Sequence, residues 1–114
     1  MSIVRKVEEL NEKPHPFLSN VGMKVLYSEE EDGGDVTCFL VKSKVGSEIE
    51  EHIHPMETDI IFVLEGRAKM WVEDYGEFTL EPGVFVVVPE GLRHRTYDVE
   101  EELLIYDVFT PAMF

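Results

Sequence analysis

The stretch from 46 to 66 reads GSEIEEHIHPMETDIIFVLEG, and the stretch from 83 to 98 reads GVFVVVPEGLRHRTYD. In both, short runs rich in Val, Ile and Phe alternate with turns that contain Gly or Pro. Branched and aromatic side chains favour β-strands, whereas glycine and proline supply the backbone angles of tight turns. Each stretch therefore predicts short strands joined by turns. The runs 60–64 and 84–88 are apolar on both faces, so both faces need cover.

The same alternation continues through the whole chain and predicts an all-β fold, either a sandwich or a barrel. Strands are expected at 23–28, 36–45, 48–54, 59–65, 67–72, 77–80, 84–88, 94–99 and 103–109. The acidic runs 29–32 and 100–102 are predicted to be solvated loops. With 114 residues, one domain over 1–114 is expected, divided into an N-terminal segment, 1–20, and a barrel, 21–110.

Charge and hydropathy exclude several classes of partner. The chain has 24 acidic and 10 basic residues and a formal net charge of −14. A surface of this sign repels nucleic acid and anionic membranes, so neither is expected as a partner. The apolar runs are far shorter than the roughly 20 residues of a membrane span. The N-terminus is too charged for a secretory signal, and we expect a cytoplasmic protein.

Three of the four histidines define a candidate metal site. His52 and His54 are two residues apart on a predicted strand and therefore share a face. Such a pair alone is more often a surface or structural feature, but Asp59 and His94 each follow a nearby turn. Imidazoles with one carboxylate suit a single divalent transition metal, namely Mn, Fe, Ni, Zn or Cu. The fourth histidine, His15, lies between two prolines and is predicted to be a loop residue outside the site.

The spacing of these residues resembles a known family. The pattern G-x5-H-x-H-x4-D-x6-G from Gly46 to Gly66, followed by G-x5-P-x-G-x2-H-x3-D from 83 to 98, is similar to the two motifs of the cupin superfamily, in particular its small single-domain (type 2) microbial members. The resemblance implies a double-stranded β-helix, which is a small jelly-roll barrel with one metal in its mouth. It also implies Asp59 as the third ligand, where the family usually carries Glu. Glu57 is the alternative ligand.

Side-chain parity predicts further residues of the pocket. Thr96 shares the face of His94, and Glu50 shares that of His52. Met70 is expected inside the barrel, so that Trp71 faces outward. The pocket is also expected to include Phe109.

Asp107 stands alone in an apolar strand, where a charge is costly unless it is paired. The ending D-V-F-T-P from Asp107 to Pro111 resembles that of small cupins that act on unsaturated uronates, in which the matching Asp and Phe line the active site. Asp107 is therefore a candidate catalytic acid or base. The alternative is a structural hydrogen bond.

Two functions from different classes are consistent with these residues. The first is a metal-dependent enzyme that acts on a small polar organic substrate such as a sugar acid, as an isomerase or lyase, or by dioxygenase chemistry. The second is a non-catalytic cupin that binds or senses a small molecule, because fold alone does not fix function. Small cupins commonly pair through their outer strands, and a homodimer is expected.

Overall fold

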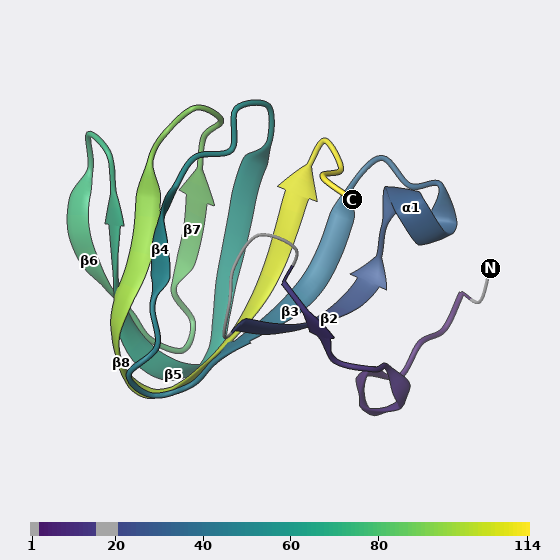
Figure 1. Cartoon of the computed structure of the whole chain (residues 1–114), viewed down its shortest axis with the longest axis horizontal. Coiled ribbons are helices and arrows are strands. Elements are labelled where there is room, and N and C mark those ends of the chain that lie inside the picture. Colours follow the sequence, from purple (N-terminus) through teal and green to yellow (C-terminus); the bar gives the residue numbers. More distant parts are fainter. Residues whose placement is uncertain (1–2, 16–20) are drawn as a thin grey trace.

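Two long strands, β5 and β8, determine the architecture of this protein. The structure is a computed structural model that describes residues 3–15 and 21–114. Residues 1, 2 and 16–20 of the predicted N-terminal segment lie outside the described part. In chain order the elements are η1 (Val7–Glu9), β1 (Lys13–Pro14), β2 (Val21–Tyr27), α1 (Glu29–Asp32), β3 (Thr37–Ser43), β4 (Ile49–His52), β5 (Thr58–Val72), β6 (Gly76–Leu80), β7 (Phe85–Val88) and β8 (His94–Thr110) (Figure 1). Neither described helix is long and apolar enough to cross a membrane.

The described strands are all antiparallel to their partners, in the order β1-β2-β3-β8-β5-β6, with β4 added on β8 and β7 on β5. The first half of β5 pairs with β7 and the second half with β6. Likewise, β4 pairs with the start of β8 and β3 with its end. The curved strands β5 and β8 therefore run through both layers, as Figure 1 shows. This is the predicted jelly-roll arrangement, and the all-β expectation is confirmed.

The close approach of β5 to β8 at its bend depends on Gly66. Its φ is 97°, and a Cβ atom built there would lie 2.3 Å from the carbonyl oxygen of Glu102. The register also shifts on both sides of it, between Val63 and Lys69. The sequence predicts strands at 59–65 and 67–72, and this division is wrong, because the bulged chain continues as one strand. For the same reason the predicted strands 94–99 and 103–109 are two halves of β8.

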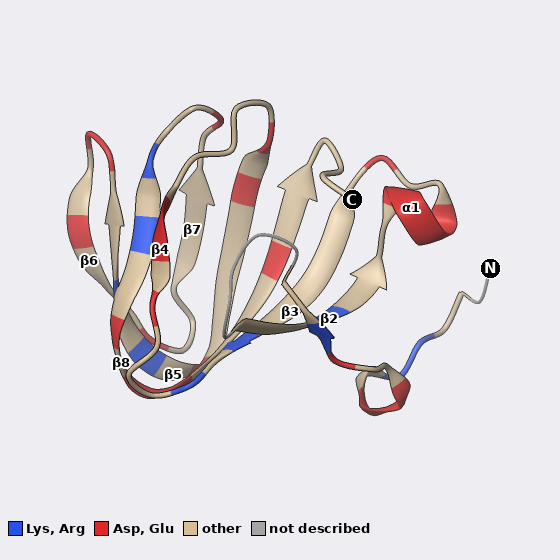
Figure 2. Cartoon of the chain, viewed as in Figure 1, with Lys and Arg blue, Asp and Glu red and all other residues tan. Residues whose placement is uncertain are grey.

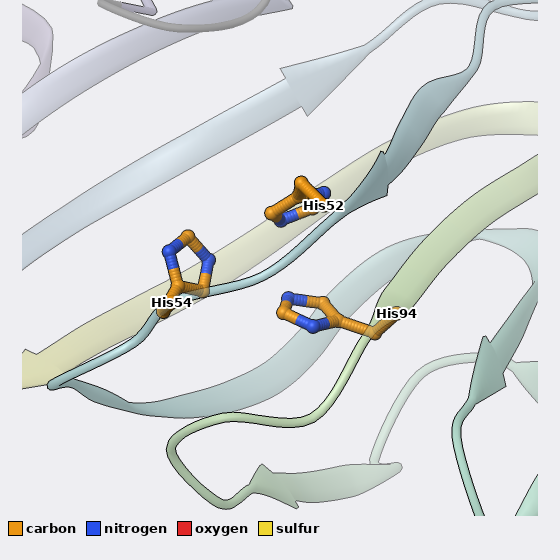
Figure 3. A group of neighbouring side chains, drawn as sticks. All are labelled: His52, His54 and His94. Carbon is orange, nitrogen blue, oxygen red and sulfur yellow. The ribbon is translucent and has the colours of Figure 1, made fainter.

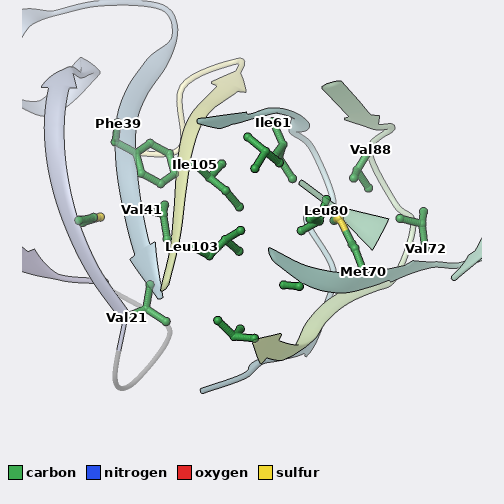
Figure 4. Packing of buried hydrophobic residues seen from close by; sticks show 14 of the residues in the cluster. Val21, Phe39, Val41, Ile61, Met70, Val72, Leu80, Val88, Leu103 and Ile105 are labelled. Carbon is green, nitrogen blue, oxygen red and sulfur yellow. The ribbon is translucent and has the colours of Figure 1, made fainter. Parts of the chain in front are cut away.

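The core lies between the two layers. Phe39, Val63, Leu80 and Leu103 are 0% exposed, and further apolar side chains from both layers surround them (Figure 4). Burial of each such side chain contributes about 1.5–3 kcal/mol. Along β5, Met70 is buried, whereas Trp71 is half-buried on the opposite face, which is the predicted parity.

The acidic run 29–32 forms helix α1 and the run 100–102 lies inside β8, so the prediction of loops is wrong for both. The hydroxyl of Ser28 accepts a hydrogen bond from the Glu31 N–H at 3.1 Å, and Gly33 ends the helix with φ 70°. A serine N-cap and a left-handed glycine are the local signals that start and stop a helix, and acidic side chains in the first turn are favourable there.

Candidate metal centre

His52, His54 and His94 converge at one end of the barrel (Figure 3). His52 ends β4 and His94 begins β8, and these two residues pair directly across the strands. His54 follows β4 in the turn that leads to β5. One ring nitrogen from each lies within 4.8 Å of the others. His54 and His94 are buried, and His52 is half-buried.

Hydrogen bonds to the backbone orient two of the rings. Nδ1 of His52 donates to the Glu50 carbonyl at 2.7 Å, and Nδ1 of His94 donates to the Leu92 carbonyl at 3.1 Å. Because a carbonyl only accepts, each Nδ1 carries the proton and each Nε2 keeps a free lone pair. Among the described residues, Nε2 of His54 and of His94 has no hydrogen-bond partner, although both atoms are buried. The three imidazoles therefore fit a divalent transition metal.

Asp59 reaches the same point from β5. Its Oδ2 lies 3.5 Å from Nε2 of His94 and 3.8 Å from Nε2 of His54, and its side chain is buried. Ligand bonds of about 2.0–2.2 Å place neighbouring ligand atoms roughly 3–3.5 Å apart. Asp59 is thus near enough to join the histidines after a small adjustment. Glu57 lies in the turn before β5, where its carboxylate accepts the Met56 N–H at 3.3 Å, and it is outside the three-histidine group.

Asp107 forms a buried carboxyl pair with Asp59, within hydrogen-bonding reach. Burial and the adjacent charge of Asp59 raise the pKa of Asp107 well above its usual range. Burial also acts to raise the pKa of Asp59. However, the adjacent carboxyl group of Asp107 and the nearby imidazoles of His94 and His54 outweigh burial and lower the pKa of Asp59. Of the two carboxyl groups, Asp107 is therefore the one whose protonated form is favoured.

The imidazoles of His52 and His54 are neutral at pH 7. Burial lowers the pKa of His54 to about 4, and burial also lowers the pKa of His52. Phe109 packs against the ring of His54 with 4.8 Å between ring centroids. Neutral imidazole is the form that binds a metal.

Two adjoining spaces surround these residues. An inner cavity of about 30 Å³, which suits one ion or water, is lined by the three histidines and both aspartates. The predicted pocket residues Met70, Thr96 and Phe109 also line it. An outer groove of about 410 Å³ shares His52 and His54 with the cavity and contains Glu50 and Glu57.

The fourth histidine is the residue that sequence reasoning missed. The prediction places His15 outside the site, whereas its side chain lines both the inner cavity and the outer groove. Pairing of β1 with β2 carries the N-terminal segment to this end of the barrel. The His15 N–H donates to the Val21 carbonyl at 3.1 Å, and its ring lies edge-on to Phe39. That placement depends on long-range register, which the local sequence does not encode.

The fold and site together define a jelly-roll barrel with a histidine-rich candidate metal centre in its mouth. The family model described as a cupin domain matches residues 39–109, which is more than half of the chain. The chain belongs to the cupin family.

A relative supports this assignment. A glucose-6-phosphate isomerase from Pyrococcus furiosus is 30% identical over 120 residues, a match that covers 95% of this chain and 62% of the relative. The chain therefore spans less than two thirds of that relative's length.

Solved structures share the fold. KdgF from a Halomonas species has a TM-score of 0.77 at 22% identity, over 91% of this chain and 90% of its own. A predicted oxalate decarboxylase from Thermotoga maritima has a TM-score of 0.83 at 18% identity, over 96% of this chain and 99% of its own.

Proposed function

We propose that this protein is a metal-dependent enzyme that acts on a small polar organic molecule. The observation that carries the proposal is the convergence of His52, His54 and His94 on one point in a cavity that also contains two buried carboxyl groups. The orphaned ring nitrogens of His54 and His94 are costly to bury unless something occupies the point between them. Strand ends hold these groups rigidly, which is what an active site requires.

A divalent ion bound there would act as a Lewis acid toward substrate oxygen atoms. Around it, the chain's own groups have distinct roles. The histidines and Asp59 would hold the ion. Asp107 lines the cavity with one carboxyl oxygen that has no hydrogen-bond partner among the described residues, so it can exchange a proton with a substrate. Met70 and Phe109 exclude water from behind the site.

A proton-transfer reaction, isomerisation or elimination, is the type that this arrangement favours. Asp107 is placed for such a transfer, and the reaction needs no oxidant. The names of two relatives, an isomerase and a predicted decarboxylase, agree with non-oxidative chemistry in proteins of this fold. Dioxygenase chemistry is the other reaction type to screen, since the ligand set suits iron or manganese as well as nickel, zinc or copper.

A non-catalytic binding or sensing role is the second candidate function. The specific observation in its favour is the small size of the inner cavity, about 30 Å³, which places most of any organic ligand in the outer groove and away from Asp107. A ligand that binds the metal-loaded protein and is recovered unchanged would support this alternative.

The experiment that tests the proposal is elemental analysis of untagged protein beside the double variant His52→Ala/His54→Ala. We expect one tightly held transition metal per chain in the wild type and less than a tenth of that in the variant. His15→Ala is the comparison variant. His15 lies outside the three-histidine group but lines the cavity, so retained metal would limit the ligands to that group and lost metal would add His15 to them. Circular dichroism would verify that both variants fold.

Absence of bound metal from the wild type, even after reloading with each candidate ion, would contradict the proposal. If metal is present, turnover is screened over sugar acids, keto acids and catechol-like or thiol substrates. Asp107→Asn should then lower kcat by about 10²–10⁴-fold while metal content is retained.

A further inference from the structure

The outer groove lies beside the candidate metal centre and is large enough for a small organic molecule. Its volume is about 410 Å³, and the exposed strand β4 forms one wall. His15, His52 and His54 line both this groove and the inner cavity, so the two spaces adjoin. A molecule that reaches the metal centre from the groove therefore passes these imidazoles.

The groove is acidic. Glu50 and Glu51 line it from β4, and Glu57 lines it from the turn before β5. Figure 2 shows the acidic colouring of β4, and no Lys or Arg occurs among the described residues that line either space. Glu57 is only 8% exposed, which makes its charge less screened by solvent than that of a surface carboxylate.

Basic residues elsewhere do not offset this charge. Five of them form ion pairs with acids away from the groove, namely Arg5, Lys13, Lys42, Arg67 and Lys69. The formal net charge of the chain, −14, adds a field of the same sign over the whole surface. An anion that enters the groove thus meets repulsion with no cationic side chain to receive it.

A second observation connects the groove to the candidate metal centre. His54, which lines the groove, is 7% exposed, and its Nε2 has no hydrogen-bond partner among the described residues. This nitrogen is one of those that would hold the metal, so the ion would lie at the inner end of the groove, within reach of a molecule that enters it.

We propose that the groove selects the positively charged or neutral, hydrogen-bond-donating end of a substrate whose other end binds at the metal centre. The proposal rests on the proposed function. It deepens that function by naming the substrate class, which is a chelating molecule with an ammonium or similar donor group at its far end. Phosphorylated and multiply carboxylated molecules are disfavoured. A sugar acid meets the condition only when its single carboxylate is the group at the metal centre.

The test uses three hydroxamates with the same chelating head and different tails. Propanohydroxamic acid is neutral, 3-aminopropanohydroxamic acid carries an ammonium group, and 3-carboxypropanohydroxamic acid carries a carboxylate. Their affinities for the metal-loaded protein are measured by calorimetry at low salt and at 0.5 M salt. We expect the ammonium probe to bind roughly tenfold more tightly than the neutral one, the carboxylate probe to bind more weakly, and added salt to reduce both differences.

Two double variants locate the effect. Glu50→Gln/Glu51→Gln removes two charges from the groove and should bring the three affinities to within about twofold of one another. Glu29→Gln/Glu30→Gln removes the same charge from α1, which does not line the groove, and should leave the order unchanged. Equal or tighter binding of the carboxylate probe, or an unchanged order in the groove variant, would overturn the proposal.

The same data separate this proposal from the one on which it rests. If the neutral probe binds and the order by charge is absent, the groove proposal alone fails. If the wild type takes up no metal, or binds none of the probes, the metal-dependent function fails and the groove proposal fails with it.

Discussion

At the scale of single residues, the backbone carbonyls that hold Nδ1 of His52 and His94 determine which nitrogen is free to bind. Because each carbonyl fixes a ring by a hydrogen bond, the site is arranged before any ligand arrives. Asp59 differs from the histidines in this respect. Asp59 is oriented by Asp107, so the distance from Asp59 to the three histidines depends on the position of the Asp107 carboxyl group.

Two single substitutions test whether Asp59 or Glu57 is the carboxylate ligand of the metal. Asp59→Asn should weaken metal binding by about 10–100-fold, because the amide oxygen carries no charge and makes a poorer ligand. Glu57→Gln is the matched control and should change metal affinity by less than about twofold. Competition with a chromophoric chelator measures both. The reverse result, in which only Glu57→Gln loses metal, would assign the third ligand to Glu57.

At the scale of elements, the bend of β5 at Gly66 holds the two layers in register. Gly66→Ala places a Cβ atom against backbone at 2.3 Å and forces an L residue into φ 97°. We expect the free energy of unfolding to fall by about 2–4 kcal/mol, as measured by urea denaturation. Gly76→Ala is the matched control. Its φ is 92° but no atom lies within 4 Å, so a loss of only about 1 kcal/mol is expected. Equal losses of stability in the two variants would show that the close approach of residue 66 to the Glu102 carbonyl is unimportant.

The same elements show what sequence can predict. The three histidines of the barrel could be found because their spacing follows a short-range motif of strands and turns. The expected reason was only partly right, since the predicted strand 48–54 ends at His52 and His54 reaches the site from the turn rather than by strand parity. The continuity of β5 through Gly66 could not be found, since a glycine between apolar runs marks a turn and a bulge equally well. His15 was missed because it reaches the site through the pairing of β1 with β2, in which Lys13 pairs with Met23, ten residues along the chain.

The contact between the N-terminal segment and α1 predicts a pH dependence. Arg5 and Asp32 form an ion pair at 2.8 Å, and the hydrogen bond from Arg5 holds the pKa of Asp32 below its usual value. A carboxyl group with a lowered folded-state pKa stabilises the protein above its unfolded-state pKa of about 3.9 and loses this effect as pH falls. Wild type should therefore be more stable than Asp32→Asn at pH 7, and the difference should shrink as pH falls below about 3.9.

A double-mutant cycle with Arg5→Gln, followed by urea denaturation at pH 7 and at about pH 3, checks this assignment. The coupling between the two positions should be present at pH 7 and smaller at about pH 3. A coupling that is the same at both values would mean that the charge of Asp32 does not stabilise the folded state.

At the scale of the whole molecule, the charge and the apolar surface are segregated. The chain carries a net charge of −14, yet the outer face of β5, β7 and the end of β8 is apolar. Phe62 pairs with Phe85 across the strands, and these side chains are 39% and 61% exposed. Leu64 and Val87 add further exposed apolar surface, at 40% and 49%. An uncharged patch of this kind on an otherwise acidic surface is typical of an interface.

We propose that this face pairs two copies of the chain, because an apolar patch can meet the same patch of a second copy across a twofold axis. Light scattering at tens of micromolar should then give twice the 13.1 kDa chain mass. Since the two copies repel each other through their net charge, added salt should strengthen the dimer rather than weaken it. Phe62→Glu/Phe85→Glu should give a monomer that keeps its metal, whereas Tyr75→Glu, at an exposed position between β5 and β6, should remain dimeric. A wild-type monomer, or a dimer that dissociates in high salt, would contradict pairing through this face.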